Sequence, residues 1–481
     1  MSSTHPEPRR RGHFGLGRSG TSDGRPAVIV TGGEHISGLA AVRSLRAAGF
    51  APWVAVIGEG GYAARSRDRA GIIRVPDPGD DPLGFVRALA AAAVDVDAVA
   101  ILPGTETALV ALVDHRAEVP AGVAIGADPH SVTNATDKRR LDVIASAAGV
   151  LVPPSVEVRL PGAAGALPFP YPVVVKPGRS EQRESSGSVR HFGARKVLEP
   201  DRLQDALDAL PGDGALIQPF QSGPLTSIAG VFWDGALVCA VQSTSDRIWP
   251  PECGSITHAE TVPLDPSVAG AVERLLRGVG FQGLFQIDAF DAGGVPVVID
   301  LNPRIYTSLG HATQAGMNLV AIWVDLLRGV VPTVPSSYRI GVRYRHDEGD
   351  PRALLRMLRQ GQVVAALRGM LPERDTAMAV FSLRDPLPSL TSLDRLLRKR
   401  GRPGVAPLVE VPSLVPLAPT RASDESAALP DSAPLPPIAA VVGAAIVPMN
   451  VPGGIVSPTG GTAGAPSILA SPSVSEGSPS S

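Results

Sequence analysis

Residues Val297 to Ala312 read VVIDLNPRIYTSLGHA, and our prediction of the fold starts from them. An apolar run here ends in an acid, an amide and a guanidinium, each two residues apart. The preceding segment, FQIDAF at 285–290, alternates in the same way, with polar side chains at even positions and apolar ones at odd positions. Such alternation is typical of strands with one buried face and one polar face. The two segments therefore predict an antiparallel hairpin whose second strand buries Val295, Val297, Ile299 and Leu301.

The polar face of this hairpin carries Asp288, Asp300 and Asn302. In a register that keeps the apolar faces together, Asp288 lies diagonal to Asp300, with about 7–8 Å between the backbones. Two carboxylates and an amide oxygen suit Mg²⁺, particularly when phosphate oxygens complete the octahedron. Either aspartate alone would more often be an ordinary surface residue. The pairing favours a metal site, and Arg304 adds a planar fork that matches phosphoryl or carboxylate oxygens.

The composition indicates a globular chain of more than one domain. At 481 residues and 44% hydrophobic residues, two or three domains are expected. The net charge of −2 gives no reason to expect a nucleic-acid surface, so we predict no nucleic-acid partner. The number of subunits stays open, and a homo-oligomer is compatible with the sequence.

Cysteine content and hydropathy favour a cytoplasmic protein. The two cysteines, Cys239 and Cys253, cannot form a disulfide framework and lack metal-site spacing. The arginines at 9–11 are not followed by the apolar segment of a signal peptide. The longest late apolar run, 438–447, is too short to cross a bilayer, so we expect no transmembrane segment.

Lysine is rare in this chain. Of 44 basic residues only four are lysines, at positions 138, 176, 196 and 399, and the others are arginines. A lysine retained against this bias indicates a position where a compact ammonium is needed and a planar guanidinium does not fit. All four lysines are therefore positions to examine for a site that needs a compact ammonium.

The chain divides into segments of different pattern. Residues 26–135 alternate between strands and amphipathic helices, which predicts an N-terminal α/β domain with a parallel sheet covered on both faces. The turn TGGEHISG at 31–38 lacks the spacing of a dinucleotide fingerprint, which argues against an NAD-dependent enzyme. Residues 136–333 mix strands, hairpins and helices, as in an α+β region.

The remaining segments carry less information. Residues 334–410 contain helical runs with arginines on one face, for which a solvated surface is a commoner explanation than a membrane or partner surface. Residues 1–25 and 411–481 are polar or rich in Pro, Ala, Ser and Gly, without periodicity, and we predict that both are disordered.

The segment IDLNPR at 299–304 resembles the acid-x-Asn-x-Arg signature of the ATP-grasp superfamily. Two further segments, TDK at 136–138 and YPVVVKP at 171–177, resemble those in which the family supplies two nucleotide-binding lysines. The resemblance implies a multidomain ATP-grasp fold with α/β and α+β parts. A Rossmann-like domain at 26–135 would precede the ATP-grasp domain at 136–333, whose lid would span about 170–222 and whose catalytic part would span 223–333.

The resemblance also implies roles for individual residues. Lys138 and Lys176 would contact ATP phosphates, with Lys176 also reaching the adenine side. Asp288, Asp300 and Asn302 would bind Mg²⁺, or Mn²⁺ in its place. The residues that would cover the phosphates are those of a mobile loop, Ser186, Gly187 and Ser188. The residues that would form the adenine-binding hinge are Gln218, Pro219 and Phe220.

One segment narrows the resemblance to a branch of the family. DRIWPPECGSITHAETVP at 246–263 resembles the carboxylate–amine ligases, as does FSLRDPLPSL at 381–390. Arg304 would then stabilise the phosphate in transfer, and Arg247 would be a second phosphate or carboxylate contact. We assign His258 a structural role, because a lone histidine before a strand is more often structural.

The implied activity is ATP- and Mg²⁺-dependent ligation of a small-molecule carboxylate to an amine, less often a thiol, through an acyl phosphate. Two departures from the family pattern leave an alternative open, a degenerate ATP-binding scaffold or sensor. The family most often has glutamate at the position of Asp300. It also has an acid after the hinge for the ribose hydroxyls, where this chain has QSGPLTS and Thr226 or Ser227 would have to serve.

Overall fold

The computed structural model describes residues 24–394, apart from residues 59, 184–188, 222, 252, 293–294 and 393. The tails expected at 1–25 and 411–481 lie outside the described residues, except for Gly24 and Arg25. The predicted phosphate-covering loop, Ser186 to Ser188, lies outside them too. None of the helices in the described part of the chain has the length and apolar character needed to cross a bilayer.

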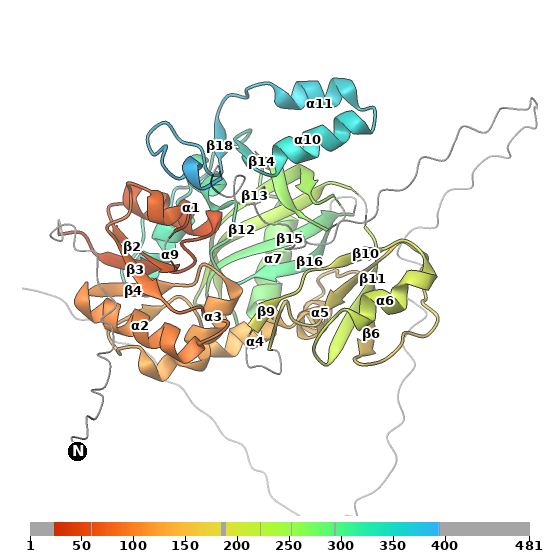
Figure 1. Ribbon diagram of the computed structural model, residues 1–481, viewed down its shortest axis with the longest axis horizontal. Coiled ribbons are helices and arrows are strands. Elements are labelled where there is room, and N and C mark those ends of the chain that lie inside the picture. Colours follow the sequence, from red (N-terminus) through yellow and green to blue (C-terminus); the bar gives the residue numbers. More distant parts are fainter. Residues whose placement is uncertain are drawn as a thin grey trace, which may run out of the picture. The chain divides into compact units, whose positions relative to one another are not determined.

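The N-terminal part forms a five-stranded sheet in the order β3-β2-β1-β4-β5, in which all neighbouring strands are parallel (Figure 1). Its strands are β1 (Ala27–Val30), β2 (Ala51–Ile57), β3 (Gly71–Val75), β4 (Ala98–Leu102) and β5 (Ala124–Ile125). Helix α1 (Ile36–Ala47) packs on one face, and helices α2 (Pro82–Asp95) and α3 (Glu106–Asp114) pack on the other. The predicted parallel sheet with helices on both faces is thus confirmed.

A second, four-stranded sheet is antiparallel, with the order β10-β7-β11-β6. Its strands are β6 (Val156–Arg159), β7 (Val173–Pro177), β10 (Arg195–Val197) and β11 (Gly214–Pro219), and the hairpin of β8 (Glu181–Arg183) and β9 (Val189–His191) lies between β7 and β10 in sequence. Helix α6 (Leu203–Asp208) covers one face, where its leucines meet Val173, Val175 and Ile217. The other face carries Lys176 and Gln218, so this sheet turns a polar face to the pocket described below.

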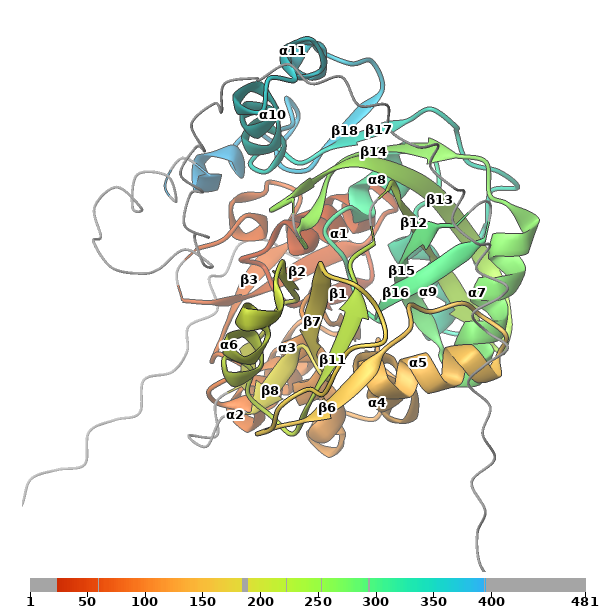
Figure 2. The same ribbon diagram turned by 90° about the vertical axis from the view of Figure 1, so that its right-hand side faces the viewer.

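The third sheet has seven strands in the order β16-β15-β12-β13-β14-β17-β18 (Figure 2). They are β12 (Leu225–Trp233), β13 (Ala236–Trp249), β14 (Ser255–Val262), β15 (Gly283–Asp291), β16 (Pro296–Asn302), β17 (Arg343–Arg345) and β18 (Thr376–Met378). Helices α4 (Pro129–Thr136), α5 (Lys138–Ala147) and α7 (Pro266–Val279) contribute to the core on one face, and α8 (Leu309–Gln314) and α9 (Leu319–Leu327) to the core on the other.

Individual predictions for this sheet are confirmed. A two-residue turn at Asp234-Gly235 joins β12 to β13, and both turn residues have positive φ, +48° and +75°, as such a hairpin turn requires. In β15 the predicted buried residues, Phe285, Ile287 and Ala289, are fully buried.

The C-terminal extension differs from the prediction. Its helices are α10 (Asp350–Arg359) and α11 (Val363–Met370), which lie side by side (Figures 1 and 2). However, the segment predicted to be helical also supplies β17 and β18 to the edge of the seven-stranded sheet. Both strands have only three residues, too few for a period-two pattern to be recognised.

Candidate functional site

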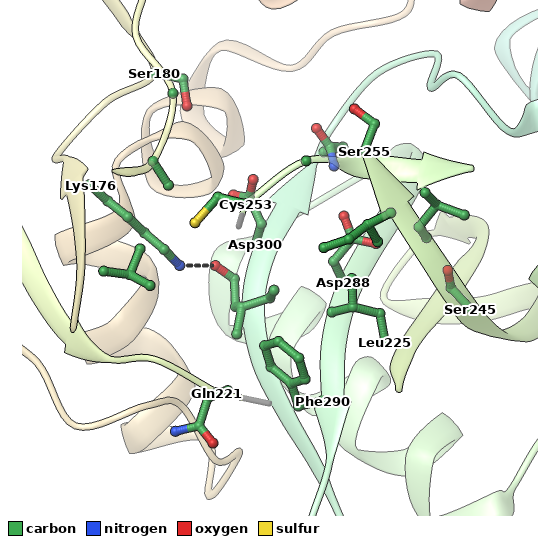
Figure 3. A pocket seen from close by; sticks show the side chains of 18 of the residues that line it. Lys176, Ser180, Gln221, Leu225, Ser245, Cys253, Ser255, Asp288, Phe290 and Asp300 are labelled. Atoms are coloured by element: carbon green, nitrogen blue, oxygen red, sulfur yellow. Dashed lines mark hydrogen bonds between the residues drawn. The ribbon is translucent and has the colours of Figure 1, made fainter. Parts of the chain in front are cut away.

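A pocket of about 610 Å³ lies between the four-stranded and seven-stranded sheets (Figure 3). Strands β7 and β11 supply one side, and strands β13, β15 and β16 supply the other. The residues predicted for function that line it are Lys138, Lys176, Gln218, Pro219, Phe220, Arg247, Asp288, Asp300, Asn302 and Arg304. The fold thus brings together every described residue that was predicted to contact phosphate, adenine or a metal.

Asp288 and Asp300 are direct cross-strand partners, which corrects the predicted diagonal relation. The reason is a β-bulge between Asp288 and Ala289, where β16 contains one extra residue. The bulge also changes the buried face of β16. Val298 is buried in the core beside Leu301, whereas the predicted core residue Val295 is 47% exposed.

The other predicted core positions of β16, Val297 and Ile299, are only partly buried. With Val298 facing the core, a regular strand would turn residues 300 and 302 to the same face. The extra residue resets the alternation, so that Asp300 and Asn302 face the pocket. Because of the bulge, Asp300 and Asn302 face the same side as Asp288, as the predicted metal site requires.

The two aspartates have opposite pKa shifts. Burial and the neighbouring Asp300 carboxylate raise the pKa of Asp288 to about 7. Burial would also raise the pKa of Asp300, but Lys138 and Lys176 outweigh it and keep that pKa below its ordinary value. Asp300 is therefore the ionised partner, and Asp288 gains most from an added cation.

The local contacts leave oxygens available for a cation. Gln286 donates from Nε2 to Asp288 Oδ1 at 2.9 Å. Asn302 donates from Nδ2 to Gln286 Oε1 at 3.3 Å. This contact uses the amide nitrogen of Asn302 and leaves its side-chain carbonyl oxygen available to a cation. Within the described residues no three His, Cys, Asp or Glu side chains form a metal cluster. A hard cation here would thus be bound by the two carboxylates, Asn302 and oxygens of a ligand.

The two predicted lysines both lie near Asp300 in the pocket. Lys138, the first residue of α5, lies with Nζ 3.1 Å from Asp300 Oδ1 and donates to Ser180 Oγ at 3.0 Å. Lys176, on β7, donates to the carbonyl oxygen of Ile299 at 3.3 Å. Burial lowers the pKa of Lys176, whereas Asp300 and Glu106 overcome burial to raise that of Lys138.

Arg304 has few partners in the pocket. Its Nη1 donates to the Ile305 carbonyl oxygen at 3.1 Å, and its buried Nε has no hydrogen-bond partner. Among the described residues it forms no ion pair within 4 Å, so its charge is available to an anion. Arg247, in contrast, lies 2.7 Å from Asp350 and 3.1 Å from Asp246.

The hinge residues line the pocket at the end of β11. The Gln218 side chain donates to Ser155 Oγ at 2.9 Å, and the Phe220 ring carries the Lys196 ammonium 3.5 Å from its centroid. Lys196 thus belongs to the support of the hinge rather than to the pocket lining. The fourth lysine, Lys399, lies outside the described residues.

The two predicted ribose contacts do not reach the pocket. Thr226 and Ser227 are buried and do not contribute to its lining. Instead, Ser227 Oγ accepts a hydrogen bond from Gln286 at 2.9 Å and also hydrogen-bonds to Asp288. Strand β12 places them one strand away from the hairpin, in direct register with Asp288 and Ala289.

Sequence reasoning missed two pocket residues. Glu106, at the start of α3, enters from the N-terminal sheet, and burial raises its pKa although Lys138 and Arg304 oppose the rise. No local pattern distinguishes it from a capping residue of a helix. Cys253 is exposed in the turn between β13 and β14 and lies near Lys176 and Asp300 (Figure 3). The predicted segment 246–263 contained it, but carried no signal for a thiol.

Comparisons identify relatives in structure only. The chain matches no protein-family model and no curated protein. It is similar to N5-carboxyaminoimidazole ribonucleotide synthetase in its ADP complex, with 12% identity over 71% of this chain and 86% of that chain and a TM-score of 0.51. It is similar to pyruvate carboxylase from Rhizobium etli, with 16% identity over 66% of this chain and 30% of that chain and a TM-score of 0.50. L-amino acid ligase from Bacillus licheniformis has 16% identity over 64% of this chain and 75% of that chain, with a TM-score of 0.49.

Proposed function

We propose that this chain, which has the ATP-grasp fold, is an ATP- and Mg²⁺-dependent ligase that joins a small-molecule carboxylate to an amine. The observation that carries the proposal is the convergence of Lys138, Lys176, Asp288, Asp300 and Arg304 on one pocket. These residues come from distant parts of the sequence and from both sheets. Stability alone gives no reason to collect three cations and two acids around a cavity.

The triphosphate of ATP would lie between the two lysines and the aspartates. Among the described residues Lys176 has a single hydrogen-bond acceptor, the backbone carbonyl of Ile299, and burial lowers its pKa, so an added phosphate oxygen would stabilise its charged form. The adenine would lie at Gln218 to Phe220, at the C-terminal end of β11. A related structure is an ADP complex, which supports a nucleotide in a pocket of this fold.

The residues present fit a divalent cation. Asp288, Asp300 and Asn302 would bind Mg²⁺, or Mn²⁺, because the raised pKa of Asp288 records a repulsion between carboxylates that a cation relieves. When bound, the ion would neutralise charge on the triphosphate and orient it. The carboxylate of Asp300, which is ionised, would supply its first anionic ligand.

The reaction would proceed in two displacements. A carboxylate oxygen of the first substrate attacks the γ-phosphorus of ATP, and the bond to the β–γ bridging oxygen breaks to give an acyl phosphate and ADP. The amine nitrogen then attacks the acyl carbon, loses a proton, and releases inorganic phosphate as the amide forms. A thiol would give a thioester by the same steps.

In this scheme the side chains act by position and charge. Arg304 would stabilise the phosphoryl group in transfer, because its guanidinium has no carboxylate partner among the described residues. Lys138 would neutralise the same region from α5. The two sheets that enclose the pocket would limit the access of water, which otherwise hydrolyses an acyl phosphate.

One contact favours a second function, an ATP-binding scaffold or sensor without chemistry. Lys138 lies 3.1 Å from Asp300, so the ammonium occupies one of the oxygens that a metal would use. In the scaffold, this ion pair would persist and nucleotide would bind without turnover.

Alkylation of Cys253 tests nucleotide binding without knowledge of the substrates. Mg·ATP should protect Cys253 from N-ethylmaleimide, because the thiol lies in the pocket beside Lys176. Cys239 is an internal control, since it is buried and burial raises its pKa to about 12. Lys176→Met should raise the half-protecting ATP concentration about tenfold, and Lys196→Met should change it much less. Equal protection of wild type and Lys176→Met would contradict the role of Lys176.

Release of ADP separates the ligase from the scaffold. Wild type with Mg·ATP and a mixture of carboxylates and amines should release ADP, and Asp300→Asn should lower the rate by about 100-fold or more while circular dichroism stays unchanged. Protection of Cys253 without ADP release from any mixture would favour the scaffold. Full activity in Asp300→Asn would contradict the metal assignment.

A further inference from the structure

Five charged side chains and the imidazole of His258 form a closed ring beside the pocket. Arg247 lies 2.7 Å from Asp350, and Asp350 lies 3.2 Å from Arg345. Arg345 lies 3.1 Å from Glu373, and Glu373 lies 3.0 Å from His258. The ring closes through Asp246, which lies 2.5 Å from His258 and 3.1 Å from Arg247. The members come from β13, β14, β17, α10 and the segment after α11.

The ring joins the C-terminal extension to both strands of one hairpin. Arg247 on β13 and His258 on β14 are direct cross-strand partners. Arg247 is bound by Asp350, the first residue of α10, and His258 is bound by Glu373. The extension therefore contacts both strands at the point where they lead into their connecting turn.

This turn and the ends of its strands line the pocket. We name residues 245–251 and 253–256 the wall segment, since most of them line the cavity and they include Cys253. Trp249 pairs with Ser255 and Ile248 with Ile256, so the two strand ends move as one unit. A shift of Arg247 or His258 would be transmitted through this pairing to Cys253.

The ring is buried enough to require its internal pairing. Asp350 has only 1% of its side chain exposed, and the Arg247 and His258 side chains have 10% and 9%. Removal of one partner from such a pair leaves an uncompensated charge in a poorly solvated place. His258 faces carboxylates with both ring nitrogens, and both contacts are hydrogen bonds at once only if both nitrogens carry a proton. With that proton the ring contains three cations and three anions.

The ring leaves part of Arg247 for a ligand. A guanidinium has five N–H donors, and among the described residues three hydrogen bonds use them, two to Asp350 and one to Asp246. The two remaining N–H groups belong to a side chain that lines the pocket. A carboxylate or phosphoryl group could accept both.

We infer that Asp350 is a positioning residue for Arg247, so that the C-terminal extension sets the wall of the pocket for an anionic group of the ligand. The inference deepens the proposed function and rests on it only for the identity of that ligand. The extension is then part of the site rather than a separate appendage. The extension acts on the pocket through its contacts with Arg247 on β13 and His258 on β14, which lie outside the extension.

Ligand-free alkylation of Cys253 tests the inference in the full chain. Asp350→Asn has nearly the same volume but no charge, so Arg247 and Arg345 lose their shared carboxylate. We expect N-ethylmaleimide to modify Cys253 at least about threefold faster in this variant, because the wall segment that holds this exposed thiol becomes more mobile. Asp350→Glu returns a carboxylate and should bring the rate back toward that of wild type.

Two controls separate this effect from general destabilisation. Cys239 lies buried on the same strand β13 and should stay unreactive in every variant that remains folded. Asp325→Asn removes the partner of Arg328 on α9, outside the ring, and should leave the Cys253 rate unchanged. If Asp350→Asn exposes Cys239 as well, Glu373→Gln is used as the test variant instead. Glu373→Gln breaks the ring at His258 on β14.

The outcomes decide the inference independently of the ligase proposal. A faster Cys253 reaction with unreactive Cys239, together with a half-protecting Mg·ATP concentration raised at least about threefold, supports it. An unchanged Cys253 rate in a folded Asp350→Asn or Glu373→Gln protein overturns it. If Mg·ATP fails to protect Cys253 in wild type, the proposed function fails, and the ligand-free rates still decide the role of Asp350.

Discussion

Asp288 and Asp300 show how two identical side chains acquire different properties from their neighbours. They lie opposite each other on adjacent strands, but the two lysines that lower the pKa of Asp300 act less on Asp288. Burial and the Asp300 carboxylate then raise the pKa of Asp288 to about 7 from an ordinary 3.8. The pair therefore has one firmly ionised carboxylate and one that is ionised at a cost.

The raised pKa of Asp288 gives a prediction about stability and pH. Between pH 4 and 7 the folded chain retains a proton on Asp288 that the unfolded chain has lost, so the free energy of unfolding falls as pH rises through this range. Asp288→Asn removes this loss. Without divalent ions at pH 8, urea unfolding should show the variant to be more stable than wild type by up to about 4 kcal/mol, because the pKa of Asp288 changes from 3.8 to about 7 on folding.

Magnesium should reverse the order of the two proteins. Mg²⁺ with ADP should raise the melting temperature of wild type, because the ion binds the ionised pair only in the folded state. It should raise that of Asp288→Asn much less. A variant that is less stable than wild type at pH 8 without metal, or that gains equally from Mg²⁺, would contradict the assignment of Asp288.

At the residue scale, the sequence predicted which side chains meet but not how. The alternation at 285–302 selected the two aspartates, and the resemblance to the ATP-grasp superfamily selected Lys138 and Lys176 from the four lysines; all four selected residues line the pocket. The bulge in β16 was not predicted, because the segment from 295 to 302 fits regular alternation on paper. The register depends on Val298 packing in the core in place of Val297 or Ile299, and the sequence alone does not show which of these apolar side chains is buried.

At the scale of elements, length separates the correct predictions from the missed ones. The amphipathic helices expected within residues 26–135 are present, for example α1 and α2. The three-residue strands β17 and β18 were not predicted, since β17 depends on pairing with β14, about 85 residues earlier, and β18 depends on pairing with β17. The edge of the central sheet is thus determined by tertiary contacts rather than by local pattern.

Helix α7 gives the test at this scale. Leu275 is fully buried where α7 packs against the seven-stranded sheet, beside Phe285 and Ile287 of β15. Leu275→Ala should lower the free energy of unfolding by about 2–5 kcal/mol, because it leaves a cavity behind the site hairpin. Urea unfolding measures this loss. Val143→Ala is the matched control, since Val143 on the neighbouring helix α5 is 70% exposed and its replacement should change stability by less than about 0.5 kcal/mol.

At the scale of the whole molecule, the ATP-grasp fold and its parallel N-terminal sheet were predicted from the sequence and are confirmed. What could not be predicted is how the N-terminal sheet contacts the segments after it. Ile305, next to Arg304, donates from its backbone to the carbonyl oxygen of Pro103 at 3.2 Å, and Asn318 donates to that of Ser44 at 2.8 Å. These partners are hundreds of residues apart, and no periodic pattern links them.

Asp385, in the segment 381–390, forms several long-range hydrogen bonds through one carboxylate. Its side chain is 2% exposed and accepts from Arg43 Nε at 3.0 Å, Ser66 Oγ at 2.7 Å and the Arg67 backbone at 3.0 Å. All three donors belong to the N-terminal part of the chain. The carboxylate thus connects the end of the C-terminal extension to α1 and to the turn that follows β2.

Asp385→Ala should therefore destabilise the protein strongly. It leaves the Arg43 guanidinium without its carboxylate and two further donors without an acceptor, which should lower the free energy of unfolding by about 3–5 kcal/mol. Asp205→Ala is the control, because its ion pair with Arg202 is exposed and should contribute less than about 1 kcal/mol. If urea unfolding places the two variants at the same stability, the extension is not bound to the N-terminal part through Asp385.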